Sequence, residues 1–361
     1  AEYSTSNWTM DNSGCVLYTG TGATGKFLNS NSSSNSKNFV VVPKEINHSI
    51  VKGLQSNAFS ELGDTVNYIL LPGGEFVTIG ATMLGTVNSV TKIQLPSGIS
   101  SIAVATFQNA SKLTDFILNE SLESNYSTPN GVLYNSNRTI LYAHPRQKEM
   151  TSSTILGTIS TIEEYACYEC DLGTAELNLP DATQIKQRAF QNAGGIKSVT
   201  FGNALQTVAQ YAFYGCPNLQ SAQNIANVED CAFMNCNSLE TTTFNSNCST
   251  IGVSGFENCS SLISCQFSTS LKSISNRSFY ATGLTNANLK DVLYLGVESF
   301  ANCNDLSSIT LSENLTYIPQ YCFYNCGLTT LTIPANVTTI DRYSFKNNTS
   351  LTVIVFNGAP N

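Results

Sequence analysis

The stretch IKSVTFGNALQTVAQYAFYGCPN, residues 196–218, determines the fold, because near-copies of it recur from about residue 50 to the C-terminus. Its apolar residues are Ile196, Val199, Phe201, Leu205, Val208 and Phe213. They are too widely spaced to close a core alone, but they would cover an identical neighbouring copy. Each copy is therefore predicted to be one rung of a solenoid. The 361 residues should form one long array rather than two or three ordinary domains.

Each rung carries an anchor residue, which is Phe213 in the quoted copy. The anchors are Phe59, Leu84, Phe107, Cys167, Phe190, Phe213, Phe233, Phe256, Phe279, Phe300, Phe323 and Phe345, with Leu84 and Cys167 as substitutes for phenylalanine. An aliphatic residue lies five positions before all twelve anchors. Successive anchors are 20 to 25 residues apart, except for one gap of 60 residues after Phe107. A period this regular predicts repeated structure over most of the chain.

The internal pattern of a rung predicts its local structure. About six residues after the anchor begins L-x-x-I-x-L, as in LSSITL at 306–311, which predicts a short parallel strand with alternate residues pointing outward. A proline or polar pair then turns the chain, and V-x-x-I forms a second extended piece. The x-x-x-A-F-x-x-C segment is expected to form a single helical or 3₁₀ turn that buries the anchor. The predicted fold class is a β-rich α/β solenoid of about 12 rungs of about 23 residues.

The chain divides into four predicted segments. Residues 1–45 lack the rung pattern, and their β-like runs predict an N-terminal cap over the first rung. Residues 46–118 are repeats. Residues 119–150 are an insertion, in which NGVLYNSNRTILYAHP predicts a β-hairpin that either projects from the solenoid or replaces part of a rung. Residues 151–361 are repeats again.

The combination L-x-x-I-x-L-P-x-x-V-x-x-I-x-x-x-A-F-x-x-C resembles the BspA-type leucine-rich repeat over roughly residues 46–356. The inserted hairpin is similar to the GVLY hairpin that these proteins often carry. The resemblance implies a leucine-rich-repeat superhelix. It also implies a surface or secreted protein of mucosal bacteria or of parasitic protists such as trichomonads, where the family is associated with adhesion to host proteins and cells. The family shares no catalytic motif, so the resemblance implies binding without naming a ligand.

The composition disfavours several classes of function. A net charge of -8 without a Lys/Arg cluster argues against nucleic acid and anionic membranes as partners. No apolar run reaches the roughly 18 to 20 residues of a spanning helix, so no membrane-spanning segment is expected in this chain. The two histidines, His48 and His144, have no paired ligand at metal spacing, and nucleophile-elbow and phosphate-loop motifs are absent. We therefore predict no enzyme activity, no cofactor and no metal.

The cysteines follow the repeat. Six of the twelve lie three residues after an anchor: Cys170, Cys216, Cys236, Cys259, Cys303 and Cys326. Asparagines often lie two residues after it, and the predicted arrangement is a column of buried thiols beside asparagines whose amides bond backbone in the turns. Cys167 and Cys170 have the C-x-x-C spacing of a redox or zinc site, but Cys167 fills an anchor position. Cys265 is expected in the core, and a Cys231–Cys248 disulfide remains open for an extracellular protein.

The outward positions of the L-x-x-I-x-L strands form the candidate binding surface, termed the strand face. They are Lys92, Gln94, Asp115, Glu176, Asn178, Ser198, Thr200, Ser221, Gln223, Thr241, Thr243, Ser264, Gln266, Asn286, Asn288, Ser308, Thr310, Thr330 and Thr332. This largely neutral row is either a merely soluble sheet surface or a rigid platform on which many weak polar contacts add. Glycans or extended host proteins would suit it better than apolar ligands.

These observations predict an extracellular protein, secreted or on the cell surface, that binds host or matrix proteins or glycans. The alternative is a structural protein that assembles end to end into a coat or filament, because the outward Val353 and Val355 of the last rung are apolar and suggest self-association. Asn-x-Ser/Thr sequences would be N-glycosylated in a eukaryotic source. The candidates are Asn7, Asn119, Asn125, Asn137, Asn314 and Asn336.

Overall fold

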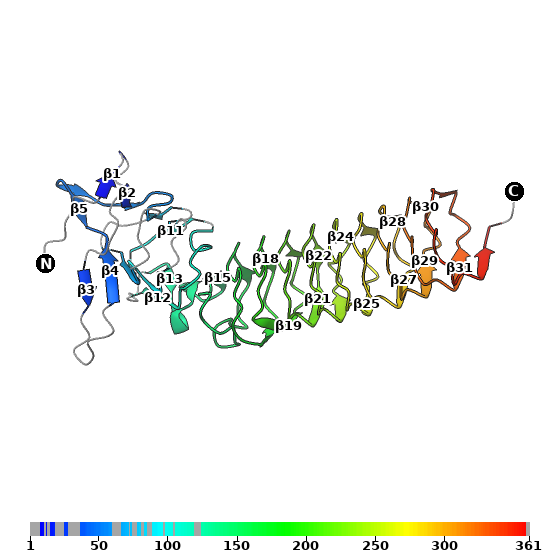
Figure 1. Ribbon diagram of the computed structural model, residues 1–361, viewed down its shortest axis with the longest axis horizontal. Helices are drawn as coiled ribbons and strands as arrows, with labels where there is room; N and C mark the ends of the chain where they lie inside the picture. The colour runs from blue at the N-terminus through cyan, green and yellow to red at the C-terminus, as the bar shows by residue number, and fades with distance from the viewer. Residues whose placement is uncertain are drawn as a thin grey trace. The chain divides into compact units, whose positions relative to one another are not determined.

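The computed structural model describes residues 8–10, 12, 15–18, 25–27, 37–59, 66–71, 73, 78–80, 83–84, 89–96, 98–103, 105–118 and 124–358. The chain divides into two compact units, which are described one at a time (Figure 1). The first unit comprises Ala1–Glu149 and Glu163–Leu172, and the second comprises Met150–Ile162 and Gly173–Asn361. The four predicted segments, with boundaries at residues 45, 118 and 150, stay a prediction.

The first unit contains two five-stranded sheets, with strand orders β1-β2-β7-β9-β11 and β3-β4-β8-β10-β12. Its strands are β1 (Trp8–Met10), β2 (Cys15–Tyr18), β3 (Gly25–Phe27), β4 (Lys37–Val41), β5 (Glu45–Ile46), β6 (Ser49–Ile50), β7 (Gly53–Leu54), β8 (Tyr68–Leu70), β9 (Thr78–Ile79), β10 (Lys92–Leu95), β11 (Ser101–Ile102) and β12 (Asp115–Leu118). Strands β2 and β4 pair parallel with β7 and β8, whereas β1 and β3 join them antiparallel. The N-terminal segment thus extends both ladders that the following rungs build.

The inserted hairpin also belongs to the first unit. Strands β13 (Tyr126–Ser127), β14 (Leu133–Asn135) and β15 (Ile140–Ala143) pair antiparallel, and the 3₁₀ helix η1 (Pro129–Gly131) precedes β14. The Asn135 carboxamide oxygen closes the hairpin turn by accepting the backbone N–H groups of Thr139 and Ile140, at 2.8 and 2.9 Å. Leu133 lies in the same buried cluster as the first-unit strands. The hairpin is therefore packed into the core of this unit.

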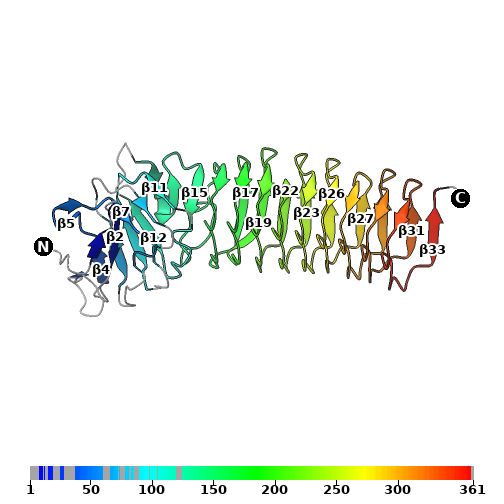
Figure 2. The ribbon, with the colours of Figure 1, turned by 90° about the horizontal axis from the view of Figure 1, so that it is seen from above.

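The second unit is a stack of rungs, each with a longer first strand and a two-residue second strand (Figure 2). The first strands are β17 (Ala175–Leu179), β19 (Ile196–Phe201), β21 (Ser221–Ile225), β23 (Thr241–Phe244), β25 (Ser264–Gln266), β27 (Asn286–Leu289), β29 (Ser308–Leu311), β31 (Thr330–Ile333) and β33 (Val353–Phe356). The second strands are β16 (Thr161–Ile162), β18 (Gln184–Ile185), β20 (Thr207–Val208), β22 (Asn227–Val228), β24 (Thr250–Ile251), β26 (Ser273–Ile274), β28 (Tyr294–Leu295), β30 (Tyr317–Ile318) and β32 (Thr339–Ile340). Pairing between rungs is parallel, as the period predicts.

The anchors form the centre of the core. In the second unit, seven anchor phenylalanines from Phe190 to Phe323 are fully buried, and successive rings stack with centroids 4.9 to 5.5 Å apart and planes within 12°. The substitutes Leu84 and Cys167 are also buried in the first unit, at 1% and 0% exposure, which confirms both as anchors. Stacked aromatic pairs contribute about 0.5–1.5 kcal/mol each beyond their burial. Each rung therefore stabilises its neighbours.

The expected helical or 3₁₀ turn around the anchor is wrong. Among the described residues the only helix is η1, outside the rungs. Residues two before and two after the anchor instead have left-handed backbone, such as Tyr211 at φ 58° and Gly215 at φ 67°. The two left-handed residues alternate with the anchor residue between them. This backbone directs the N–H groups of all three residues along the axis of the stack, toward carbonyl oxygens of the next rung. Thus Phe213 N donates to Ala232 O at 2.7 Å, and the turn forms a third ladder in place of a helix.

Candidate ligand-binding face

The strand face is in register from rung to rung. In the second unit, Ser198 pairs with Ser221 and Thr200 with Gln223, and Asn286 pairs with Ser308. All nineteen predicted residues lie on first strands of the two units, and each is exposed or half-buried. Most of the residues between them, such as Val199, are buried, while Cys265 and Ile309 are half-buried. The structure therefore brings sixteen of them together on the second unit and three, at positions 92, 94 and 115, on the first.

Several strand-face side chains are occupied by their neighbours. The Gln223 amide nitrogen donates to Ser221 Oγ at 2.7 Å, and Thr243 Oγ1 donates to the Gln223 amide oxygen at 2.9 Å. Glu176 pairs with Lys197 at 2.7 Å, and hydrogen bonding to this lysine lowers the pKa of the glutamate. These contacts leave the middle of the row less able to bind a ligand than composition alone predicts.

A cleft of about 310 Å³ interrupts the strand face between β25 and β27. Strand β25 is the last strand of its sheet and β27 the first of the next, so the two are not paired along their length. The strand-face residues Gln266 and Asn288 line the cleft from opposite rungs, together with Lys290 and Asp291. Composition and period carry no sign of this opening. It lies where β25 and β27 do not pair, although β29 and β31 also belong to separate sheets.

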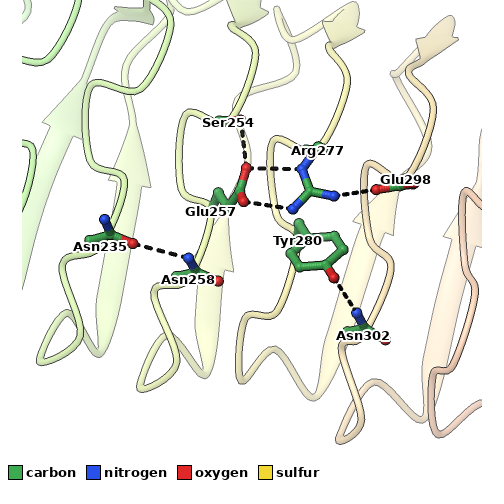
Figure 3. Close-up of polar contacts among 8 residues, drawn as sticks. All are labelled: Asn235, Ser254, Glu257, Asn258, Arg277, Tyr280, Glu298 and Asn302. Atoms are coloured by element: carbon green, nitrogen blue, oxygen red, sulfur yellow. Dashed lines mark hydrogen bonds and ion pairs between the residues drawn. The ribbon is translucent and has the colours of Figure 1, made fainter.

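A second polar row, on the anchor turns, was not singled out by the sequence patterns as a surface. The asparagine amides here contact one another and tyrosine hydroxyls, not backbone as predicted (Figure 3). Asn258 Nδ2 donates to Asn235 Oδ1 at 3.0 Å, and Asn302 Nδ2 donates to the Tyr280 hydroxyl at 2.6 Å. Asn258 has φ 61°, and asparagine tolerates this left-handed backbone better than most residues. The asparagine column is thus a consequence of the turn geometry.

An ionic cluster crosses three of these turns. Arg277 pairs with Glu257 at 2.7 Å and with Glu298, and its guanidinium lies 3.6 Å from the centre of the Tyr280 ring (Figure 3). Ser254 donates to the Glu257 carboxylate at 2.6 Å. Burial raises the pKa of Glu257, but the hydrogen bonds from Arg277 and Ser254 outweigh it, so the pKa is lowered overall. The arginine is fully engaged by these partners and is a structural residue.

The buried thiol column is confirmed. Each column cysteine of the second unit donates its S–H to the carbonyl oxygen of the preceding anchor, as Cys236 does to Phe213 O at 2.9 Å. Burial raises the pKa of Cys303 to about 11, and that of Cys170, in the first unit, to about 12. Cys170 and Cys303 therefore stay protonated at neutral pH, whereas metal binding and nucleophilic attack need the thiolate. This disfavours redox or zinc chemistry at the C-x-x-C motif.

The remaining cysteines and the histidines show no assembled site. Cys231 and Cys248 are free thiols in this structure, and Cys265 is half-buried with its sulfur 3.2 Å from Thr242 Oγ1. His144 is buried and contacts the Pro145 carbonyl, and burial lowers its pKa to about 4. His48 is exposed. Within the described ranges no cluster of three or more His, Cys, Asp or Glu could hold a metal ion.

Four of the six candidate glycosylation sites lie in the described residues. Asn125, Asn137, Asn314 and Asn336 are all exposed, so the side chains are accessible. Asn7 and Asn119 lie outside the described residues. Modification of any of them stays a prediction. In the part of the chain that the structure describes, no helix has the length and apolarity of a membrane span.

The comparisons with known proteins agree with the repeat architecture. A family profile described as "BspA type Leucine rich repeat region (6 copies)" matches residues 32–140, 141–230 and 226–352. The comparison with curated proteins finds no match. Among solved structures, the chain is similar to a leucine-rich repeat protein from Bacteroides ovatus, with 19% identity, a TM-score of 0.55, and coverage of 98% of this chain and 88% of that one. At this identity the similarity shows the fold alone.

Two further solved structures are less similar in shape. One is a leucine rich cell surface protein from Faecalibacterium prausnitzii, with 16% identity, a TM-score of 0.48, and coverage of 99% of this chain and 95% of that chain. The other is a leucine-rich repeat protein from Eubacterium ventriosum, with 22% identity, a TM-score of 0.48, and coverage of 87% and 77% respectively.

Proposed function

The chain belongs to the BspA-type leucine-rich repeat family, and from this premise we propose that it is an extracellular, non-enzymatic binding protein, secreted or on the cell surface. Its ligands are host or matrix proteins or glycans, and its role is adhesion. The observation that carries the proposal is the in-register row of polar, mostly uncharged side chains along the strand face of the second unit. Because the parallel ladders hold these side chains in place, contacts to an extended ligand can add with little ordering cost.

Binding assays with strand-face variants test this proposal. Thr200, Thr310 and Thr332 are exposed on first strands, and replacing all three with Glu adds like charges along the row without touching the core. We expect this variant to lose at least tenfold in binding to a panel of matrix proteins and a glycan array. The matched control places the same substitution at Thr250 and Thr339, which are exposed on second strands, and should bind like the parent. Equal binding by both variants would exclude the strand face.

A second candidate role is self-association through the last rung. All four residues of β33, Val353, Ile354, Val355 and Phe356, are between 46% and 63% exposed, and exposed apolar patches mark interaction sites. This supports end-to-end assembly as an alternative. Light scattering over a hundredfold range of concentration separates the two roles, since a constant monomer mass counts against assembly.

A further inference from the structure

We propose that the cleft between β25 and β27 binds one sugar ring of a glycan, while the adjoining strand face holds the rest of the chain. The inference rests on the proposed binding role of the strand face and names both a subsite and a ligand class. It starts from the shape of the opening. The β25 rung turns through three residues between Phe267 and Leu271, whereas the β27 rung turns through only two between Leu289 and Val292.

The two rungs separate after their first strands begin. Thr285 N still donates to Ile263 O, at 3.4 Å, but no strand pairing follows between β25 and β27. By contrast β17, which is also followed by a two-residue turn, pairs with β19 over its five residues. The space left at β25–β27 is about 310 Å³, at the lower end of the size range of small-molecule sites. It therefore suits one ring of a ligand better than a folded segment.

The polar groups at the cleft are available to a ligand. Within the described residues, the side-chain ends of Gln266, Lys290 and Asp291 make no hydrogen bond or ion pair, and the Asn288 amide nitrogen has no acceptor. This differs from Gln223 and Glu176 on the same face, whose side chains are engaged by neighbours. Two amides, the Lys290 ammonium and the Asp291 carboxylate offer both donors and acceptors to a ligand, whereas the Lys272 ammonium beside them is held by the Thr269 and Asp291 carbonyl oxygens. Neutral hydroxyl groups, which both donate and accept, match this set.

An apolar surface completes the cleft. Phe267 and Val292 line it beside Cys265. The Phe267 ring is held in place by the rings of Phe244 and Phe279, with centroids 5.8 and 5.5 Å away. A sugar ring presents C–H groups on its faces and hydroxyls at its edge, so it can pack on such a surface while bonding the polar rim. A peptide carboxylate or phosphate would face the Asp291 carboxylate, and the second nearby ammonium, Lys272, is already bonded to the Thr269 and Asp291 carbonyl oxygens at 2.9 and 3.3 Å.

The experiment compares equivalent double variants in two rungs. N288A/D291A removes two of the polar side chains that line the cleft, and N304A/D305A makes the same changes at two exposed residues between an anchor turn and β29, off the strand face. Binding is measured on a glycan array of galactose-, mannose- and N-acetylglucosamine-terminated oligosaccharides, and on the matrix-protein panel. We expect the parent to bind at least one terminal sugar, the cleft variant to lose at least tenfold, and the control to stay within twofold. Circular dichroism should show both variants folded.

Each other outcome overturns the inference. If the cleft variant binds its glycan like the control, the sugar lies elsewhere on the strand face. If the parent binds matrix proteins but no glycan, and the Thr-to-Glu strand-face variant loses that binding, the proposed function stands and the sugar site falls. If the cleft variant alone loses matrix-protein binding with no glycan bound, the occupant is a protein segment and the assignment to a sugar is wrong.

Discussion

In five rungs of the second unit, one buried thiol makes a hydrogen bond that composition does not reveal. Cys236 is fully buried and its S–H lies 2.9 Å from Phe213 O, so it fills space and donates a hydrogen bond at once. Thr282 and Asn348 occupy the same rung position and also donate to anchor carbonyls. The shared property is a small side chain with a donor. The column therefore needs no oxidation or metal to explain its recurrence.

Replacing Cys236 with Ala should lower the free energy of unfolding by about 1–2 kcal/mol, since it removes one hydrogen bond and leaves a small cavity. Thermal and urea midpoints of the purified protein measure this. Cys231 is half-buried and outside the column, so its replacement with Ala should change stability by no more than about 0.5 kcal/mol. Equal losses in both variants would show that the column thiol has no special role.

At the level of structural elements, the anchor turn is where sequence and structure differ most. The periods of the apolar residues correctly predict both strands, the anchors and the outward rows, because burial is periodic and period is visible in sequence. The turn was predicted to be a single helical or 3₁₀ turn that buries the anchor. The left-handed position two residues before the anchor is filled by Tyr211, Ser254 and Arg277, among others, and no residue preference identifies it, whereas the position two after the anchor is often asparagine. Contacts between rungs hold this backbone in place.

The cleft was unpredictable for a related reason. Gln266 and Asn288 appear in the sequence as ordinary members of the strand face, equivalent to their neighbours. They line the cleft because β25 and β27 do not pair. Whether two strands pair depends on both rungs, so the pattern of one rung does not predict it. The engagement of the Gln223 side chain is hidden in the same way, because its partners Thr241 and Thr243 are about 20 residues away.

The ionic cluster on the anchor turns gives a prediction at this scale. Glu257 is 6% exposed and depends on Arg277 from the next rung. Replacing Arg277 with Leu should cost about 2 kcal/mol at pH 7, because it leaves a buried carboxylate without its partner. K197A breaks an exposed pair on the strand face and should cost less than about 1 kcal/mol. Urea denaturation measures both, and equal costs would contradict the structural role of the cluster.

The pH dependence of this difference has a definite sign. The pKa of Glu257 in the folded protein is below its ordinary value of 4.5, so the unfolded state binds more protons in that range. The contribution of ionised Glu257 to the free energy of unfolding is complete above about pH 4.5. It is lost as the pH falls through the pKa that Glu257 has in the folded protein. The difference in the free energy of unfolding between the parent and R277L should therefore become smaller below pH 4.5. A gap that widens on acidification would argue against the assignment.

On the largest scale, the second unit behaves as a linear series of equivalent rungs. Neighbouring rungs contact one another through the turn ladder and the anchor stack, and most of them also through paired strands, so stability should be a sum of rung and interface terms. Deleting residues 236–258 removes one period and joins Asn235 to Cys259, which keeps every ladder in register. This variant should fold with the parent's far-ultraviolet dichroism per residue and a midpoint lower by a few degrees.

Deletion of residues 236–247 is the control for register. It joins Asn235 to Cys248 and removes half a period, so strand positions would face turns in the next rung. We expect loss of cooperative unfolding and aggregation from this variant. If the half-period deletion folded as well as the full-period one, stacking in register would not be what defines the array.

The ladders have a mechanical consequence. Their hydrogen bonds run from rung to rung, so a pull on the last rung of the second unit along the stacking direction opens one interface at a time instead of shearing many together. Each rung released adds roughly 76–83 Å of extended chain, from about 23 residues at 3.3–3.6 Å each. A protein tethered at one end and holding a ligand at the other would then lengthen in steps under flow. It would dissipate force through its outermost rungs while the rest of the strand face stayed attached.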